Sequence, residues 1–199
     1  FLLSTPGLVE ELMDNDQKCL NFYRQVLRVI YRVLFLFYAE QRKLMPTHSA
    51  LYAQEYSLSS LRDKIESKLS IDGQHTDIWD GLKVTFKMVY EGVPELGITA
   101  FNGQLFSTDN ISLLNKSQCR NDKLLETIKY MSMFEKEGLS YRISYVELSV
   151  DEIGAIYESL LEYIPRICSN SETFEDAVIG SRRNRERQIP PRTFFLDPR

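Results

Sequence analysis

Three observations predict a mostly α-helical, irregular multi-helix domain with at most a short β element. The chain has 199 residues, of which 43% are hydrophobic, so it is long enough to bury a sizeable core. Apolar residues recur at helical spacing in several segments. The nine glycines are sparse and form no GxG or GxxxxGK pattern, which excludes Rossmann-like and P-loop phosphate sites.

The first half of the chain predicts three helices. A short helix is expected to begin at Pro6, with Thr5 as its cap, and to end at the DND break at 14–16. The strongest pattern covers about 16–44, where apolar residues recur every three or four positions, and Pro46 ends it. A third helix is expected over 57–68 and is followed by an Asp-Gly turn.

The rest of the chain predicts three further helices. The pattern over 76–90 is helical, and so is the stretch 121–137, where Gly138 is interpreted as the stop signal. A short extended piece is expected over 141–145. The sequence SVDE at 149–152 predicts a capping box for a helix that ends before Pro165.

Charge is distributed unevenly along the chain. Lysine and arginine number 24 against 28 carboxylates, a net charge of −4, which excludes a general nucleic-acid coat. The last 20 residues carry six arginines and two carboxylates, a balance of +4, which leaves −8 for the rest. We therefore predict a helical domain over 1–165 and a basic C-terminal segment over 166–199.

The cysteines, apolar runs and histidines indicate the cellular location and exclude several kinds of catalytic or metal site. The cysteine count is odd and contains no CxxC pair, which favours a reducing, cytoplasmic location. No apolar run is long enough to cross a membrane. The two histidines, His48 and His75, are isolated, so a zinc site or a Ser-His-Asp triad lacks its residues. We predict no catalytic, cofactor-binding or metal-binding residue.

Two groups of arginines are candidate DNA contacts. Arg24, Arg28 and Arg32 have a spacing of four and form a stripe on the long predicted helix, where they face either DNA phosphates or acidic residues of neighbouring helices. The second group is Arg182, Arg183, Arg185 and Arg187, which is typical of a phosphate contact or of a solvated linker.

Six segments in order resemble the helical region of large bacterial restriction-modification and phage-defence adenine methyltransferases, of the type IIG and BREX-like kinds. They are YRVLFLFYAE at 31–40, YSL at 56–58 with LR at 61–62, WDGL at 79–82, GI at 97–98 with FNGQLF at 101–106, ISY at 143–145 with Leu148, and GAIYESLLEY at 154–163. In that family the region is a connector between an N-terminal portion and the methyltransferase core. The resemblance covers roughly 22–165.

The resemblance implies a non-catalytic scaffold fragment that packs against the rest of a parent methyltransferase and contacts DNA phosphates through local basic patches. The parent would use S-adenosylmethionine, with or without an endonuclease, and its cofactor turn and adenine loop do not occur in this sequence. A helical protein-interaction domain with no DNA role is the alternative. A third hypothesis is a metal nuclease that uses Glu66 and Lys68 of an ExK triplet.

Overall fold

The computed structural model describes the whole chain except residues 3, 14, 68–72, 102, 168–171, 176–185, 190–193 and 199. It confirms the mostly α-helical class with short β elements. The helices are α1 (Leu8–Met13), α2 (Asp16–Gln41), α3 (Leu58–Glu66), α4 (Asp77–Glu91), α5 (Ser112–Lys116), α6 (Asn121–Ser132) and α7 (Val150–Leu161). Shorter helical turns are η1 (Tyr52–Tyr56), η2 (Pro94–Leu96) and η3 (Thr108–Ile111).

The strands form three antiparallel pairs. They are β1 (Met133–Lys136) with β2 (Leu139–Arg142), β3 (Tyr163–Ile167) with β6 (Phe194–Pro198), and β4 (Glu172–Glu175) with β5 (Glu186–Ile189). Strand β3 crosses the boundary predicted at 165 and joins the C-terminal segment through β6. The division into two domains itself stays a prediction.

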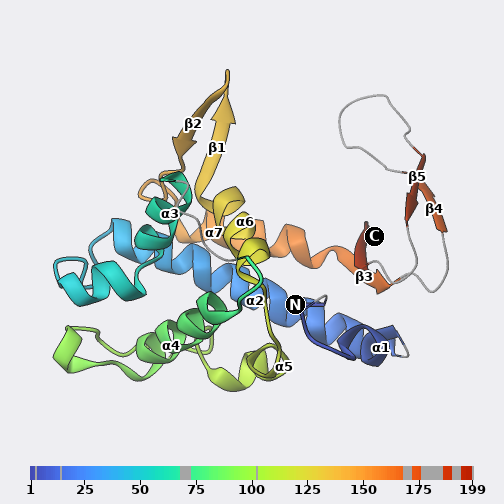
Figure 1. The fold of residues 1–199 in the computed structure, drawn as a ribbon, viewed down its shortest axis with the longest axis horizontal. Coiled ribbons are helices and arrows are strands. Elements are labelled where there is room, and N and C mark those ends of the chain that lie inside the picture. The colour runs from blue at the N-terminus through green and yellow to red at the C-terminus, as the bar shows by residue number, and fades with distance from the viewer. Residues whose placement is uncertain are drawn as a thin grey trace.

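Helix α2 is the long axis of the molecule, and the other helices lie around it (Figure 1). Its N-terminus is capped by Asn15, whose side chain accepts a hydrogen bond from Lys18 N at 3.0 Å. Its apolar side packs into one core together with residues of α4 and the loops, among them the fully buried Trp79, Phe86 and Phe106. The long core helix predicted from the sequence is therefore confirmed.

The C-terminus of α2 lies three residues before the predicted end. The amides of Lys43 and Leu44 donate to the carbonyls of Glu40 and Ala39, the bond pattern of a Schellman motif. This motif requires a left-handed residue, and Lys43 adopts it with φ of 57°. The chain thus turns away before Pro46 and not because of it.

The prediction of one helix over 121–137 is wrong in its second part. Helix α6 ends at Ser132, and the next residues form a hairpin that projects from the helical body (Figure 1). Glu137 and Gly138 both have positive φ, 54° and 77°, which is the two-residue turn that joins tightly twisted strands. Gly138 therefore serves a hairpin turn and not a helix end.

The capping box predicted for the last helix is confirmed. The side chain of Ser149 accepts from Glu152 N, and Glu152 accepts in return from Ser149 N at 2.8 Å. Helix α7 lies beside α2, where Tyr157 makes an edge contact with Tyr31 at 5.1 Å between ring centroids. It ends at Leu161, before Pro165, as the sequence predicts.

Candidate nucleic-acid interface

The three arginines predicted as a stripe on α2 become progressively more buried along the helix. A helix advances about 100° per residue, so a spacing of four rotates each successive side chain about 40° around the axis. Arg24 is exposed, Arg28 is half-buried, and Arg32 has 0% of its surface exposed. The three side chains therefore do not form one surface stripe.

Arg32 is a structural residue, which corrects its prediction as a DNA contact. Its Nε donates to Leu105 O and its Nη2 to Ser107 O, both at 2.7 Å. Its guanidinium lies 5.2 Å from the ring centre of Phe86. Burial, with a smaller contribution from Arg28, lowers the pKa of Arg32 to about 10, so it stays protonated at neutral pH. The charge is enclosed by carbonyls and aromatic faces and is not accessible to a phosphate.

The side chains of Arg28 and Arg24 differ in whether a protein group already binds them. The Nη1 of Arg28 donates to Asn110 O at 3.1 Å, which ties it to η3, directly before α5. The expectation that these arginines pair with carboxylates also differs from the structure, because the partners of Arg28 and Arg32 are backbone carbonyls. Arg24 forms no ion pair with a described residue and is the member of the stripe that a phosphate can reach.

The second arginine group lies mostly beyond the described residues. Arg182, Arg183 and Arg185 are among those that the structure leaves out, and Arg187 is described through its backbone in β5, opposite Phe174. Their role in DNA contact stays a prediction.

Buried polar side chains of α2 hold the backbones of distant segments. The carboxylate of Glu40 accepts from Leu58 N at 2.8 Å and from Ser59 N at 2.9 Å, which satisfies the first amides of α3. It also accepts from the Tyr52 hydroxyl at 3.0 Å. Burial and the Glu40 carboxylate raise the pKa of Tyr52, so the phenol remains a donor.

Two glutamines of α2, the buried Gln25 and the half-buried Gln41, extend this pattern along the helix. Gln25 Oε1 accepts from Leu113 N at 2.9 Å and thereby fixes the start of α5. Gln41 Oε1 accepts from Tyr145 N at 2.7 Å and thereby fixes the loop before α7. Because isolated buried polar groups are costly, each bond selects one position for the loop that it holds.

The β1–β2 hairpin has two faces of opposite character. Phe134 pairs with Tyr141 and Lys136 with Leu139, so these four side chains share one face. Phe134, Leu139 and Tyr141 are 49%, 61% and 44% exposed, and the two rings stack at 5.4 Å. This group, which we call the hairpin apolar face, is unusual for a surface because its large apolar side chains are adjacent.

The other face of the hairpin is fixed to the helical body by Arg142. Its Nε donates to Glu66 Oε1 at 2.7 Å and its Nη2 to Asp63 Oδ1 at 2.8 Å, both on α3. The hydrogen bond from Arg142 lowers the pKa of Glu66. Glu66 is thus engaged in an ion pair, while Lys68 of the ExK triplet lies outside the described residues.

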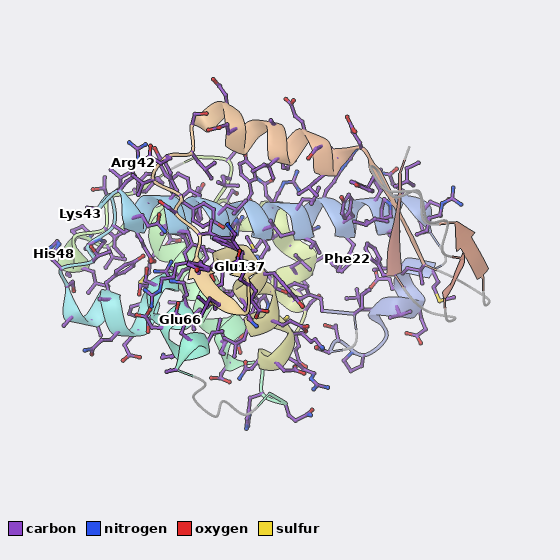
Figure 2. The ribbon with its side chains drawn as sticks, turned by 90° about the horizontal axis from the view of Figure 1, so that it is seen from above. Phe22, Arg42, Lys43, His48, Glu66 and Glu137 are labelled. Atoms are coloured by element: carbon purple, nitrogen blue, oxygen red, sulfur yellow. The ribbon has the colours of Figure 1, made fainter. Side chains whose placement is uncertain are left out.

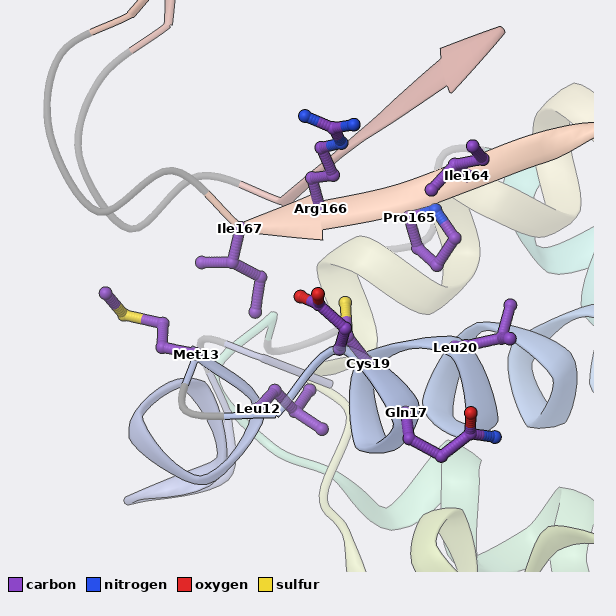
Figure 3. A pocket seen from close by; sticks show the side chains of 10 residues that line it. Leu12, Met13, Gln17, Cys19, Leu20, Ile164, Pro165, Arg166 and Ile167 are labelled. Carbon is purple, nitrogen blue, oxygen red and sulfur yellow. The ribbon is translucent and has the colours of Figure 1, made fainter. Parts of the chain in front are cut away.

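A cleft of about 530 Å³ lies between the start of α2 and strand β3 (Figure 3). Its wall includes Leu12, Leu20 and Ile167, together with the buried thiol of Cys19. Burial, aided by the Asp16 carboxylate, raises the pKa of Cys19, which keeps the thiol protonated and a poor nucleophile. The cleft contains none of the predicted DNA-contact residues.

The described residues hold neither a metal-binding group of side chains nor a helix that could span a membrane. Among those residues, no three His, Cys, Asp or Glu side chains are grouped so that they could hold a metal ion. None of the described helices combines the length and the apolarity that crossing a bilayer requires.

The buried polar residues of α2 were missed by the sequence reasoning. Gln25 and Glu40 lie on its buried side without a predicted role, and Arg32 lies there too although it was predicted as a surface contact. A signal for Arg32 was present, because Val29 and Leu36 stand three residues before and four after it, on the same side of a helix.

Comparison of the chain with family models, curated proteins and solved structures gave no match.

Proposed function

We propose that the chain is a non-catalytic helical scaffold of a restriction-modification or phage-defence DNA adenine methyltransferase. In this role it packs against the methyltransferase core and contacts DNA phosphates through local basic groups. The support from sequence is the ordered resemblance over 22–165. The proposed parent uses S-adenosylmethionine in the cytoplasm, and this chain supplies neither the cofactor site nor the adenine pocket.

The observation that carries the proposal is the way α2 fixes its surroundings. Arg32 holds the loop before η3, Glu40 holds α3, and Gln41 holds the loop before α7. A polar side chain that is buried, as Arg32 and Glu40 are, or half-buried, as Gln41 is, satisfies its partner at one geometry and penalises others. The result is a body whose surface elements keep fixed relative positions, as a scaffold between two other parts requires.

The hairpin apolar face is the surface that we assign to the methyltransferase core. A two-stranded hairpin is marginally stable in water without further packing. Here one face is anchored by Arg142, while Phe134, Leu139 and Tyr141 remain exposed. Aromatic residues are enriched in protein interfaces, and a rigid pair of stacked rings loses little entropy on binding.

The packing role is tested in the parent protein with the double variant Phe134→Ser and Tyr141→Ser. Transfer of labelled methyl groups to DNA is expected to fall at least about tenfold, the effect of losing 1.4 kcal/mol of interface. The control is Val84→Ser, because Val84 on α4 is 48% exposed but lies outside the hairpin. Equal activity of the double variant and the control would refute the packing role.

A helical protein-interaction domain with no DNA role is the second candidate. It is favoured by Arg32 and Arg28, two basic residues of α2 that are engaged with backbone carbonyls. Anisotropy of labelled duplex DNA, titrated between about 50 mM and about 200 mM salt, separates the two candidates. A steep loss of affinity with salt supports the DNA role, and absence of binding at the lower salt supports the alternative.

A further inference from the structure

The segment that follows α2 is basic in sequence although the chain is acidic, and exposed Glu55 and Glu147 stand next to it in the sequence and next to Val146 respectively. Residues 41–54 include Arg42, Lys43 and His48 but no aspartate or glutamate, in a chain with a net charge of −4. All three side chains are exposed. Figure 2 shows them along one end of the molecule, where α2 stops. We call these three residues the α2-end cluster.

Lys43 occupies a backbone conformation that favours glycine. Its φ of 57° is the left-handed position of the Schellman motif, where a Cβ atom costs about 1 kcal/mol. The helix dipole favours a cation near a helix C-terminus, but a lysine in the last turn of α2 would satisfy it on ordinary helical backbone. The dipole therefore does not account for a lysine at this position.

Arg42 is held with its guanidinium in place. Its Nη2 donates to Val146 O at 2.6 Å, and its guanidinium carbon lies 5.1 Å from the ring centre of Tyr38. Neither Arg42 nor Lys43 forms an ion pair with a carboxylate in the described part of the chain. Glu40, the nearest carboxylate in sequence, is buried and accepts hydrogen bonds from α3.

We propose that the α2-end cluster binds the phosphate backbone of a nucleic acid. A positioned arginine supplies a planar set of donors, lysine supplies a compact charge, and His48 supplies a ring N–H. Such contacts are made through phosphates and do not depend on base sequence. The proposal rests on the proposed DNA contact and assigns it to residues other than the arginine groups predicted from the sequence.

The decisive variant is Lys43→Gly, which removes the charge and relieves the backbone. We expect its melting temperature to rise by about 2–4 °C, so weaker binding cannot be attributed to unfolding. The affinity for a labelled duplex of about 20 base pairs should fall, and the slope of log affinity against log salt should decrease by about 1. The double variant Arg42→Gln with Lys43→Gly should lower the slope by about 2.

The matched control is Lys123→Gln on α6, an exposed lysine paired with Glu126. It tests the general loss of one positive charge. If Lys43→Gly and this control change the slope equally, the cluster is not the site, although the proposed DNA contact stands. If the wild-type chain binds no duplex at about 50 mM salt, both fail, and the packing role is decided separately by the hairpin variants.

The other polyanion to be tested is an acidic polypeptide. Polyglutamate of matched charge should bind more weakly than the duplex, because carboxylates on a flexible chain do not present the regular spacing of a phosphate backbone. Equal affinity that also depends on Lys43 would overturn the nucleic-acid assignment in favour of an acidic protein partner.

Discussion

The helical body and the β1–β2 hairpin have opposite distributions of polarity. In the body, Arg32 and Glu40 are buried, and their charges hold the backbones of other segments. In the hairpin, Phe134 and Leu139 are exposed, while Arg142 forms ion pairs with α3. The body thus satisfies its polar groups internally, whereas the hairpin leaves apolar surface uncovered.

This contrast separates the parts that build the molecule from the parts that are available for binding. A buried arginine surrounded by carbonyls and rings stabilises the fold and cannot serve a ligand. A rigid hairpin that exposes stacked rings has a surface whose burial would be favourable, since apolar area contributes about 25 cal/mol per Å² removed from water. Whether a side chain stabilises the fold or is available for binding is therefore decided more by its position than by its residue type.

The largest effect is expected for Arg32→Ala. The substitution leaves Leu105 O and Ser107 O without their donor and opens a cavity between aromatic rings. We expect the free energy of unfolding in urea to fall by about 3–5 kcal/mol. The matched variant Arg24→Ala should change it by less than about 0.5 kcal/mol. Similar values for the two arginines would remove the distinction between body and surface.

Glu40→Gln is expected to have the next largest effect. An amide keeps one acceptor oxygen but replaces the other with an NH2 donor, which would face an amide that now donates to the carboxylate at Leu58 N or Ser59 N, so the start of α3 loses part of its capping. The free energy of unfolding should fall by about 2–3 kcal/mol. Hydrogen exchange should show the loss first at the amides of α3, and unchanged protection there would contradict the role of Glu40.

Glu137→Asn tests the hairpin in the stabilising direction. Asparagine tolerates the left-handed conformation better than glutamate, and Asn-Gly is the preferred pair for this two-residue turn. We expect about 0.5–1 kcal/mol of stabilisation, confined to β1 and β2. NMR amide exchange of Phe134 and Tyr141 should slow, while the amides of α2 keep their rates. Faster exchange in the hairpin would rule out the proposed turn.

The smallest effect concerns pH. Arg142 lowers the pKa of Glu66 in the folded chain, so the stability that this pair contributes is complete above the unfolded pKa of glutamate. It is lost as the pH falls through the lower, folded pKa. Because both side chains are partly exposed, we expect less than about 1 kcal/mol. Carboxyl NMR titration should show the pKa of Glu66 rising in Arg142→Gln, and an unchanged value would exclude the pair.

Much of the helical framework follows from local patterns. The apolar spacing of α2 and the capping box at Ser149 predicted their elements correctly. Each of these signals is made by residues that stand only three or four positions apart in the chain. The sequence pattern did not reveal the hairpin, because Gly138 follows a helical pattern and resembles a helix stop signal. Strand β2 is recognisable as a strand only through its pairing with β1. Local propensity does not register such pairing.

By itself, the sequence determined the fold class, the long core helix and the uneven charge of the chain. The tertiary structure decided which arginines are accessible. By residue type and spacing, Arg24 and Arg32 are equivalent. On α2, however, they point in different directions around the helix axis, and the side of Arg32 is covered by the loop at Leu105 and Ser107. The physical reason is that burial is set by what packs on a helix face, and those residues lie more than 70 positions away in the chain.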